Sequence, residues 1–381
     1  MRGAGQVVIG IDIGTTSTKV VAYDTAGRRT CEAEAGYPLA EPQPGYAVQD
    51  PEAVLAAVQS SLGKVATTAR DAGRTVAGVS FSSAMHSLIG LDGGGVPLTP
   101  SITWADLRAT DQAERLRGLS VGAELHRRTG TPVHPMSPLT KLIWFREREP
   151  AVFSSAARWV GIKEYVLAHL TGEFVVDRSI ASATGLMDLV SLGWWPPALE
   201  LAGVRADQLP PIVATTELLA FRPAIAAHLG LEGVPIVVGA GDGPLANLGV
   251  GAVRPGVAAC SVGTSGAARV IVEHPGVDPL GRVFCYALTD ERWAVPSAME
   301  VSSWSGHARP SPGARRRPCW PLRHRRPPDP TACSCCPTRS ASVPPTGAHS
   351  PAGRTSASPG PTGGHTWSGP HSRESASSLP W

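Results

Sequence analysis

Apolar and polar positions along the first 300 residues predict a succession of strands and helices. Residues 7–13 are an almost continuous apolar run, which predicts a buried strand. Residues 19–24 predict a second strand, which returns after the turn at residues 14–17. Residues 76–82 and 235–239 predict two further strands, and the second of these leads directly into a glycine-rich stretch.

Helices are expected between these strands. Asp50 followed by Pro51 is typical of a helix start, because aspartate caps the first turn and proline fits the first helical position. This helix is expected to reach about Ala69, and another is expected to begin at Ser137. The last predicted strands follow one another in quick succession between residues 257 and 295.

The pattern changes near Met299. Residues 304–381 hold 15 Pro and 10 Arg, no Lys, Ile, Phe or Tyr, and three branched aliphatic residues, Leu322, Val343 and Leu379. Such a segment cannot bury enough apolar surface to offset the entropy lost on ordering it. We therefore expect residues 299–381 to form a disordered C-terminal tail.

Net charge separates the same two parts of the chain. The whole chain carries +3, but residues 304–381 contribute +8, which leaves −5 on the remainder. A nucleic-acid-binding face needs a basic stripe that neutralises phosphates. The mildly acidic remainder therefore argues against nucleic acid as a partner.

Cysteine usage and hydropathy point to a cytoplasmic protein. Cys31, Cys260 and Cys285 precede residue 300 without a recognisable spacing, which suits a reducing compartment. There is no apolar run of about 18 residues that would span a membrane, and no apolar region of a signal peptide near the N-terminus. We expect a soluble cytoplasmic enzyme without membrane contact, and a homodimer stays open.

Two turns rich in glycine and threonine are the first candidates for chemistry. They comprise Gly14, Thr15, Thr16 and Ser17 in the first half of the chain, and Gly263, Thr264 and Ser265 about 250 residues later. Backbone N–H groups and hydroxyls in such turns can donate to phosphate oxygens. One turn alone would be an ordinary polar hairpin. The repetition, together with Asp12 as a suitable Mg²⁺ ligand at the end of the first strand, favours phosphate binding by two similar halves that face one cleft.

Asp242 lies between two glycines after a predicted strand, where its side chain can project into a cleft. Phosphoryl transfer to a hydroxyl needs a carboxylate that accepts the hydroxyl proton. An aspartate that stabilises a turn is the alternative interpretation.

Several loop-like segments carry side chains that suit a polyol. They are Met85, His86, Trp104, Asp106 and Arg108. An aromatic face packs on C–H bonds, while Asp, Arg and His form hydrogen bonds with hydroxyls. For His86 taken alone, a structural role is the more usual interpretation.

Together these stretches resemble the FGGY carbohydrate kinases, and most closely the gluconate kinases among them. The matching motifs include GIDIGTTSTKVV at 10–21, SFSSAMHS at 80–87, LTPSITWADLRA at 98–109, RTGTPVHPMSPLTKL at 128–142, GAGDGPLANLGVGAV at 239–253 and SVGTSGAAR at 261–269. The resemblance covers about residues 6–295.

The resemblance implies an α/β protein with the sugar-kinase/actin-like fold, which is related to ribonuclease H. Two domains would enclose the active site. Residues 1–237 would be the N-terminal sugar-binding domain, and residues 238–298 an incomplete, truncated C-terminal ATP-binding domain, followed by the tail.

The resemblance also implies roles for the candidate residues. Asp242 would contact D-gluconate and take the proton from its terminal hydroxyl, and Asp12 would order Mg²⁺. The two turns would hold the phosphates of ATP, and the polyol-binding set would line the sugar-acid pocket. Arg108, His134 and Lys163 are candidates for the cation that binds the substrate carboxylate.

Two other functions stay open. The first is a kinase of the same family that acts on xylulose or another pentulose. The second is a non-catalytic sugar-binding or regulatory protein with an actin-like first domain. Asp12 and Asp242 count against the second, because binding alone needs neither a base nor a magnesium ligand.

The family pattern breaks after Trp293. The resemblance predicts an Asn-Gly-Gly-aliphatic stretch there, then several helices and a glycine-rich adenosine-binding loop, and the sequence has none of them. Met299 and Trp304 each have a single codon. Read from each third base, the codons of residues 297–305 permit Ser-Asn-Gly-Gly-Leu-Val-Leu-Val-Trp, which is the expected continuation. We therefore infer a frameshift near residues 295–298 and expect little or no kinase activity from the chain as written.

Resequencing the locus across codons 290–310 tests the frameshift. The expected result is a second reading frame that encodes the Asn-Gly-Gly stretch and continues into the missing part of the domain. A clean read of the present frame with no such overlap would remove the hypothesis.

Overall fold

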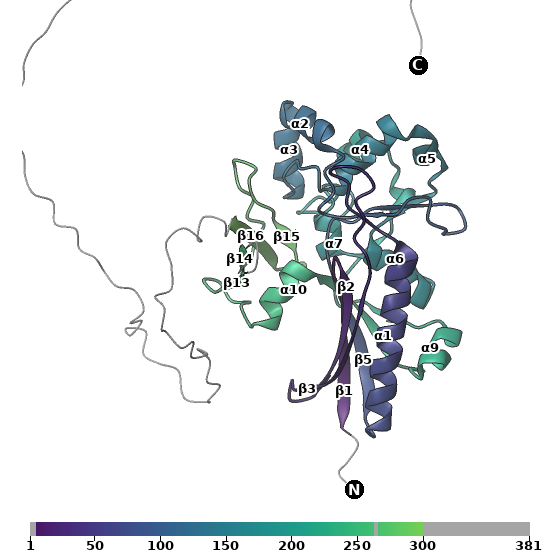
Figure 1. Cartoon of the computed structure of the whole chain (residues 1–381). Coiled ribbons are helices and arrows are strands. Elements are labelled where there is room, and N and C mark those ends of the chain that lie inside the picture. Colours follow the sequence, from purple (N-terminus) through teal and green to yellow (C-terminus); the bar gives the residue numbers. More distant parts are fainter. Residues whose placement is uncertain (1–4, 263–265, 300–381) are drawn as a thin grey trace, which may run out of the picture. The chain divides into compact units, whose positions relative to one another are not determined.

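The computed structural model describes residues 5–262 and 266–299 (Figure 1). The expectations for Gly263, Thr264, Ser265 and the tail from residue 300 onward lie outside these residues. Met299, the first residue of the expected tail, ends a strand instead. The expected division of the chain at residue 237 stays a prediction.

A six-stranded mixed sheet is the centre of the described chain. Its order is β11-β12-β5-β1-β2-β3. The strands are β1 (Gln6–Ile13), β2 (Ser17–Asp24), β3 (Arg29–Gly36), β5 (Thr75–Ser83), β11 (Leu218–Ala220) and β12 (Pro235–Gly241). The first three form an antiparallel meander, while β5 and β12 run parallel to β1. The strands predicted at 7–13, 19–24, 76–82 and 235–239 are confirmed within two residues at each end.

The buried apolar face of the sheet is covered by its longest helix. Val7, Ile9, Ile11 and Ile13 alternate along β1 and are almost fully buried. They contribute to one apolar core with α1 (Pro51–Asp71), which lies along β1, β2 and β3 (Figure 1). The Asp50 carboxylate caps α1 as predicted, because it accepts the N–H of Glu52 at 3.0 Å. Helices α6 (Ile162–Thr171) and α9 (Pro223–Leu229) pack against the same core.

A second core lies in a helical region inserted between β5 and β12. Its helices are α2 (Thr110–Arg117), α3 (Ser120–Thr129), α4 (Pro138–Arg148), α5 (Pro150–Ser155) and α8 (Pro196–Ala202). Two short antiparallel ribbons accompany them: β4 (Val48–Gln49) with β7 (Ser101–Ile102), and β6 (Ile89–Leu91) with β8 (Arg158–Val160). Trp144, Phe145 and Trp159 are among the buried side chains of this core.

The strands predicted between 257 and 295 form a separate antiparallel sheet in the order β13-β14-β16-β15. They are β13 (Ala258–Val262), β14 (Gly266–Val272), β15 (Tyr286–Ala287) and β16 (Trp293–Met299). A third core joins this sheet to the first part of the chain, because Tyr286 and Trp293 cluster with Met85 and Ile180. Helix α10 (Asp242–Gly249) contacts both β12 and β14.

A buried charged cluster lies behind β12. The Lys163 ammonium group forms an ion pair with Asp177 and donates to the Val238 carbonyl at 3.3 Å. Asp177 in turn caps α7 (Arg178–Ser182), because it accepts the N–H groups of Ser179 and Ile180 at 2.9 and 3.1 Å. This pair ties α6, β9 (Val176–Asp177) and β12 together beneath the strand ends.

Glu164 is the uncompensated member of that cluster. The pKa of its carboxyl is raised to about 7, first by burial and also by the charge of Asp177, while the charge of Lys163 opposes the rise. Within the part of the chain that the structure describes, its Oε1 atom is buried without a hydrogen-bond partner. Since a raised carboxyl pKa favours the protonated form, the folded chain holds this proton after the unfolded chain, near the ordinary value of 4.5, has lost it.

The free energy of unfolding should therefore fall as the pH rises from about 4.5 to about 7, and the full penalty should persist above 7. Glu164→Gln keeps the shape and removes the ionisation. We expect this variant to exceed the parent in stability by roughly 1–3 kcal/mol at pH 8 and to match it near pH 4.5. Urea unfolding at both pH values measures the difference. The exposed Glu200→Gln is the matched control, and an equal effect of Glu164→Gln at both pH values would contradict the prediction.

Candidate active site

The carboxyl ends of three parallel strands bring the two candidate carboxylates to one edge of the sheet. Asp12 in β1 pairs with Ser82 in β5, and Gly241 in β12 pairs with Ser83. Asp242 follows Gly241 directly and begins α10. Ligands of open α/β sheets bind outside the carboxyl ends of the strands, so this edge of the sheet is the candidate location of the site.

An open cleft of about 470 Å³ occupies that edge. It is lined by Asp12, Ser82, Asp242, Gly243, Leu245, Ala246, Ser261 and Arg269. These residues come from β1, β5, α10, β13 and β14, so the cleft has walls from both parts of the described chain. The structure thus places Asp12 and Asp242 in one cavity, together with the Arg269 guanidinium.

The environment of Asp242 suits a proton acceptor. Its side chain is exposed to the cleft, yet surrounding protein atoms desolvate the carboxyl enough to raise its pKa. The negative charge of Asp12 adds to this rise, while the N–H of Gly243 and the charge of Arg269 oppose it. The Gly243 N–H donates to Asp242 Oδ1 at 2.7 Å and so fixes the carboxylate at the start of α10. A carboxylate with a raised pKa is a stronger base than an ordinary aspartate.

The glycines around Asp242 are explained by close packing. Gly239 has φ +74°, and a Cβ there would lie 1.8 Å from the Phe81 carbonyl oxygen. A Cβ at Gly241 would lie 2.5 Å from the sulfur of Met85. Met85 therefore packs against the strand end that presents Asp242. This predicted substrate residue lies beside the cleft but does not line it. Its contact with substrate stays a prediction.

The turn at Gly14, Thr15, Thr16 and Ser17 connects β1 to β2 immediately after Asp12. The N–H of Gly14 donates to the Ser17 carbonyl at 2.9 Å, and a Cβ on Gly14 would lie 2.9 Å from that same oxygen. Trp104, which is 44% exposed, donates its indole N–H to Thr15 Oγ1 at 2.9 Å. A predicted sugar-binding residue thus contacts a predicted phosphate-binding residue.

Asp106 and Arg108 bind each other. The guanidinium donates to both carboxylate oxygens, at 2.8 and 2.9 Å, and Asp106 also accepts the N–H of Ala47 at 2.7 Å. The Arg108 guanidinium lies 4.0 Å from the centre of the Tyr46 ring. Both side chains are buried, and neither lines the cleft around Asp242. Their predicted contacts with substrate stay predictions, and the structure supplies each with other partners.

His86 joins three segments of the described chain. Its Nδ1 lies 2.8 Å from the Ala183 carbonyl, which can only accept, so Nδ1 carries the proton. Nε2 therefore accepts from the Tyr286 hydroxyl, 3.2 Å away. Burial, aided by the charge of Lys141, lowers the pKa of His86 to about 3 and keeps the ring neutral. This geometry supports the structural interpretation of His86.

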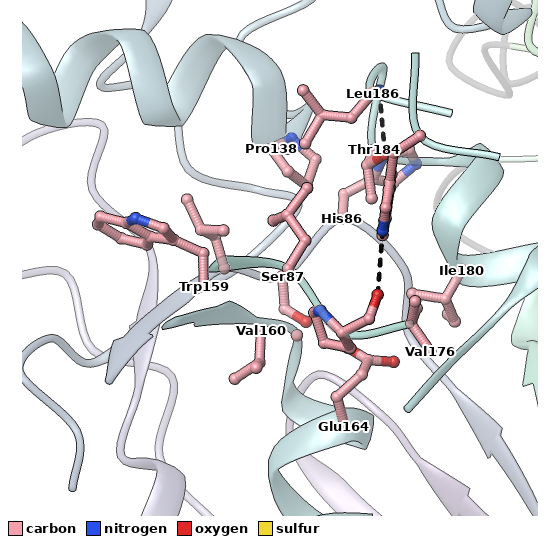
Figure 2. Close-up of a pocket in the computed structure, with 15 residues that line it drawn as sticks. His86, Ser87, Pro138, Trp159, Val160, Glu164, Val176, Ile180, Thr184 and Leu186 are labelled. Atoms are coloured by element: carbon pink, nitrogen blue, oxygen red, sulfur yellow. Dashed lines mark hydrogen bonds between the residues drawn. The ribbon is translucent and has the colours of Figure 1, made fainter. Parts of the chain in front are cut away.

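His86 also lines a small cavity of about 30 Å³ (Figure 2). Figure 2 shows His86, Ser87, Pro138, Trp159 and Glu164 around it. It has room for about two water molecules, since a cavity needs roughly 10–15 Å³ of such volume to hold one. It is too small for a sugar, so the cleft at Asp242 remains the candidate site.

Of the cations proposed for a substrate carboxylate, Arg108 and Lys163 are engaged by Asp106 and Asp177. Burial, followed by the charge of Arg117, lowers the pKa of His134. Arg269, which the sequence reasoning did not single out, is the cation on the wall of the cleft.

Tyr286 was also missed. It is 4% exposed, and burial followed by the negative charge of Asp242 raises its pKa well above 10. Arg269 and Tyr286 lie on β14 and β15, and no local pattern showed that these strands would face Asp242.

The residues that line the cleft fit a magnesium ion held by one protein carboxylate, that of Asp12, and not one enclosed by several protein ligands. Within residues 5–262 and 266–299, no group of three or more His, Cys, Asp or Glu side chains could hold a metal. Mg²⁺ is commonly held through one or two carboxylates, with water and substrate phosphates as the other ligands. The Asp12 carboxylate on the wall of the cleft suits that role, which stays a prediction.

In the described ranges no helix is long and apolar enough to cross a membrane.

Comparison with known proteins gives consistent relatives. A gluconokinase of Bacillus subtilis is 44% identical over 290 residues, which are 76% of this chain and 56% of that protein. A xylulose kinase of Lactococcus lactis is 33% identical over 261 residues, which are 68% of this chain and 52% of that protein. The crystal structure of gluconate kinase from Lactobacillus acidophilus has a TM-score of 0.76 at 36% identity, and the match covers 79% of this chain and 62% of that one.

These matches confirm the predicted sugar-kinase fold for the described residues, and this chain spans little more than half the length of the curated relatives. The sequence model of the FGGY family of carbohydrate kinases, N-terminal domain, matches residues 7–249. The chain therefore belongs to the FGGY family of carbohydrate kinases.

Proposed function

We propose that this architecture transfers the γ-phosphoryl group of ATP to the terminal hydroxyl of D-gluconate. The observation that carries the proposal is the shared cleft of Asp12 and Asp242 at the carboxyl ends of β1, β5 and β12. The similarity to gluconokinases, at 44% identity, supports gluconate as the acceptor.

Asp242 acts as the base in this proposal. A hydroxyl that enters the cleft donates to the Asp242 carboxylate, which aims the oxygen for in-line attack on the γ-phosphorus of ATP. Asp242 takes the proton as the new O–P bond forms, while the bond from the γ-phosphorus to the bridging oxygen breaks and ADP leaves. The pKa of Asp242 is raised by desolvation, which favours this proton transfer. Mg²⁺ would supply charge neutralisation for the phosphates, with Asp12 as its protein ligand. The turn at 14–17 would donate N–H groups and hydroxyls to phosphate oxygens.

Arg269 gives the cleft the one positive side chain among its described lining residues. It is placed to attract either the carboxylate of a sugar acid or a phosphate oxygen. A xylulose or other pentulose kinase is the second candidate, because one xylulose kinase is 33% identical in sequence and a xylulose kinase of known structure is 36% identical and shares the fold. A purely binding function would need neither the base nor the magnesium ligand.

We further propose that the chain as written is impaired as a kinase. In the described part, β13 and β15 form the two edges of the second sheet. Residues 304–381, with three branched aliphatic residues, cannot supply the apolar surface that covers such a sheet or lines an adenine pocket. A coupled assay of ADP release with gluconate should show little or no turnover, and turnover of roughly 1–100 per second would contradict impairment.

The base is tested in a chain whose reading frame is restored after residue 295. Asp242→Asn should lower kcat for gluconate by about 10²–10⁴-fold and change the affinity for gluconate only a few-fold, because the amide keeps the size but cannot accept the proton. Asp207→Asn, an exposed change near Arg205, is the matched control and should leave both unchanged.

The same assay separates the candidate substrates. Preference for gluconate over xylulose in kcat/KM supports the proposal, and the reverse preference supports the pentulose kinase. Unchanged turnover in Asp242→Asn would sink the assignment of the base.

A further inference from the structure

The backbone carbonyls of Gly14, Thr15 and Thr16, in the turn after Asp12, are all occupied as hydrogen-bond acceptors. The Gly14 carbonyl accepts from the Tyr37 hydroxyl at 2.9 Å and from Gln49 Nε2 at 3.4 Å. The Thr15 carbonyl accepts from the same Gln49 nitrogen at 2.7 Å, and the Thr16 carbonyl accepts the N–H of Tyr37 at 3.0 Å. Gln49 and Tyr37 are 4% and 7% exposed, so both donors are held in place by packing.

This arrangement orients the donors of the turn. A trans peptide points its N–H away from its C=O. The N–H groups of Thr15 and Thr16 share peptide planes with the carbonyls of Gly14 and Thr15. Because those carbonyls face Gln49 and Tyr37, the two N–H groups face the opposite side. A turn held in this way offers donors rather than acceptors to an anion.

The side chain of Thr15 is oriented by the same logic. An indole N–H can only donate, so the bond from Trp104 Nε1 uses Thr15 Oγ1 as the acceptor. The hydroxyl proton of Thr15 is then left to donate elsewhere. Trp104 therefore acts on the turn as a third donor from outside, beside Gln49 and Tyr37.

Gln49 lies in the β4–β7 ribbon, and Trp104 follows it two residues after the end of β7. Gln49 in β4 pairs with Ser101 in β7, three residues before Trp104. The N–H and the hydroxyl of Thr103 both donate to the Ala47 carbonyl, at 3.0 and 2.9 Å.

The buried Lys141 ammonium group reinforces this ribbon. It donates to the carbonyls of Ile102 and Thr103 at 3.2 and 2.8 Å, and to that of His86 at 2.6 Å. The ribbon is thereby tied to the segment that holds Met85 and His86.

We propose that Gln49 and Trp104 are positioning residues, which use the β4–β7 ribbon to hold the 14–16 turn with its acceptors engaged and its donors free for phosphate. Trp104 then links the sugar-binding segment to the phosphate-binding turn, so that a ligand bound at one of them changes the environment of the other. The proposal rests on the proposed function in one respect, namely that the turn receives phosphate.

The link itself is tested without any ligand. Full-length chain labelled with ¹⁵N at its ten indoles gives NMR signals among which that of Trp104 is identified by its loss in Trp104→Phe. Thr15→Val removes the acceptor and should shift the Trp104 signal, whereas Thr15→Ser keeps the hydroxyl and should leave the signal close to its original position. An unmoved signal in Thr15→Val would overturn the link, whatever any ligand does.

The role of Gln49 is tested with inorganic tripolyphosphate and Mg²⁺ as the probe. Gln49→Met keeps the length of the side chain but cannot donate, and should weaken binding of the probe about three- to tenfold by calorimetry. Gln208→Met is the matched control, because it removes a comparable bond, from Gln208 Nε2 to the Ala156 carbonyl at 3.0 Å, and should leave affinity unchanged.

The outcomes distinguish the two proposals. Equal affinity of Gln49→Met and the parent would refute the positioning role. A parent chain that does not bind the probe, while Thr15→Val still shifts the Trp104 signal, would refute the phosphate assignment of the turn in this chain and leave the link between Trp104 and Thr15 standing; the kinase activity itself is tested separately by Asp242→Asn in the frame-restored chain. Binding of the probe that shifts the Trp104 signal in the parent and in Thr15→Ser, but not in Thr15→Val, supports both.

Discussion

The convergence of β1, β5 and β12 at their carboxyl ends is the constraint on which the site depends. Asp12 and Asp242 are 230 positions apart in the chain, and the parallel register through Ser82 and Ser83 brings them to one cleft. Two carboxylates in one cleft repel each other, and this repulsion adds to the desolvation that raises the pKa of Asp242. The same geometry therefore assembles the site and adjusts its chemistry.

Buried polar groups hold the loops around that cleft in place. Lys141 gathers three backbone carbonyls, Lys163 binds Asp177 beneath β12, and His86 connects Ala183 to Tyr286. Each of these three side chains has hydrogen-bond partners, as burial demands. Glu164, next to Lys163, differs from them, because its Oε1 has no partner within the described residues and burial raises its pKa. The loops near the candidate site are thus fixed by side chains that do not line the cleft.

Much of the first sheet could be predicted from the sequence, because apolar runs bounded by glycine and proline are local signals. The cap at Asp50, the start of α1 and the strand before Asp242 follow from such signals. The partners of Asp106 and Arg108 could not be predicted, since residue types that suit a sugar also suit a buried ion pair. Arg269 and Tyr286 were missed because only the packing of β14 and β15 onto the first part of the chain gives them a role.

The pattern of these errors has a physical cause. Residues whose function depends on neighbours within a few positions, such as Gly14 in its turn, carry that function in the local sequence. Residues whose function depends on a distant segment, such as Gln49 beneath the 14–16 turn, carry no local sign of it. Gln49 lies in a two-residue strand. Its pairing with β7 and its burial, which only the structure shows, turn its side chain toward the 14–16 turn instead of leaving it on the surface. Where several strands meet to form a site, the reacting groups can therefore be predicted from the sequence, whereas the residues that position them can be identified only from the structure.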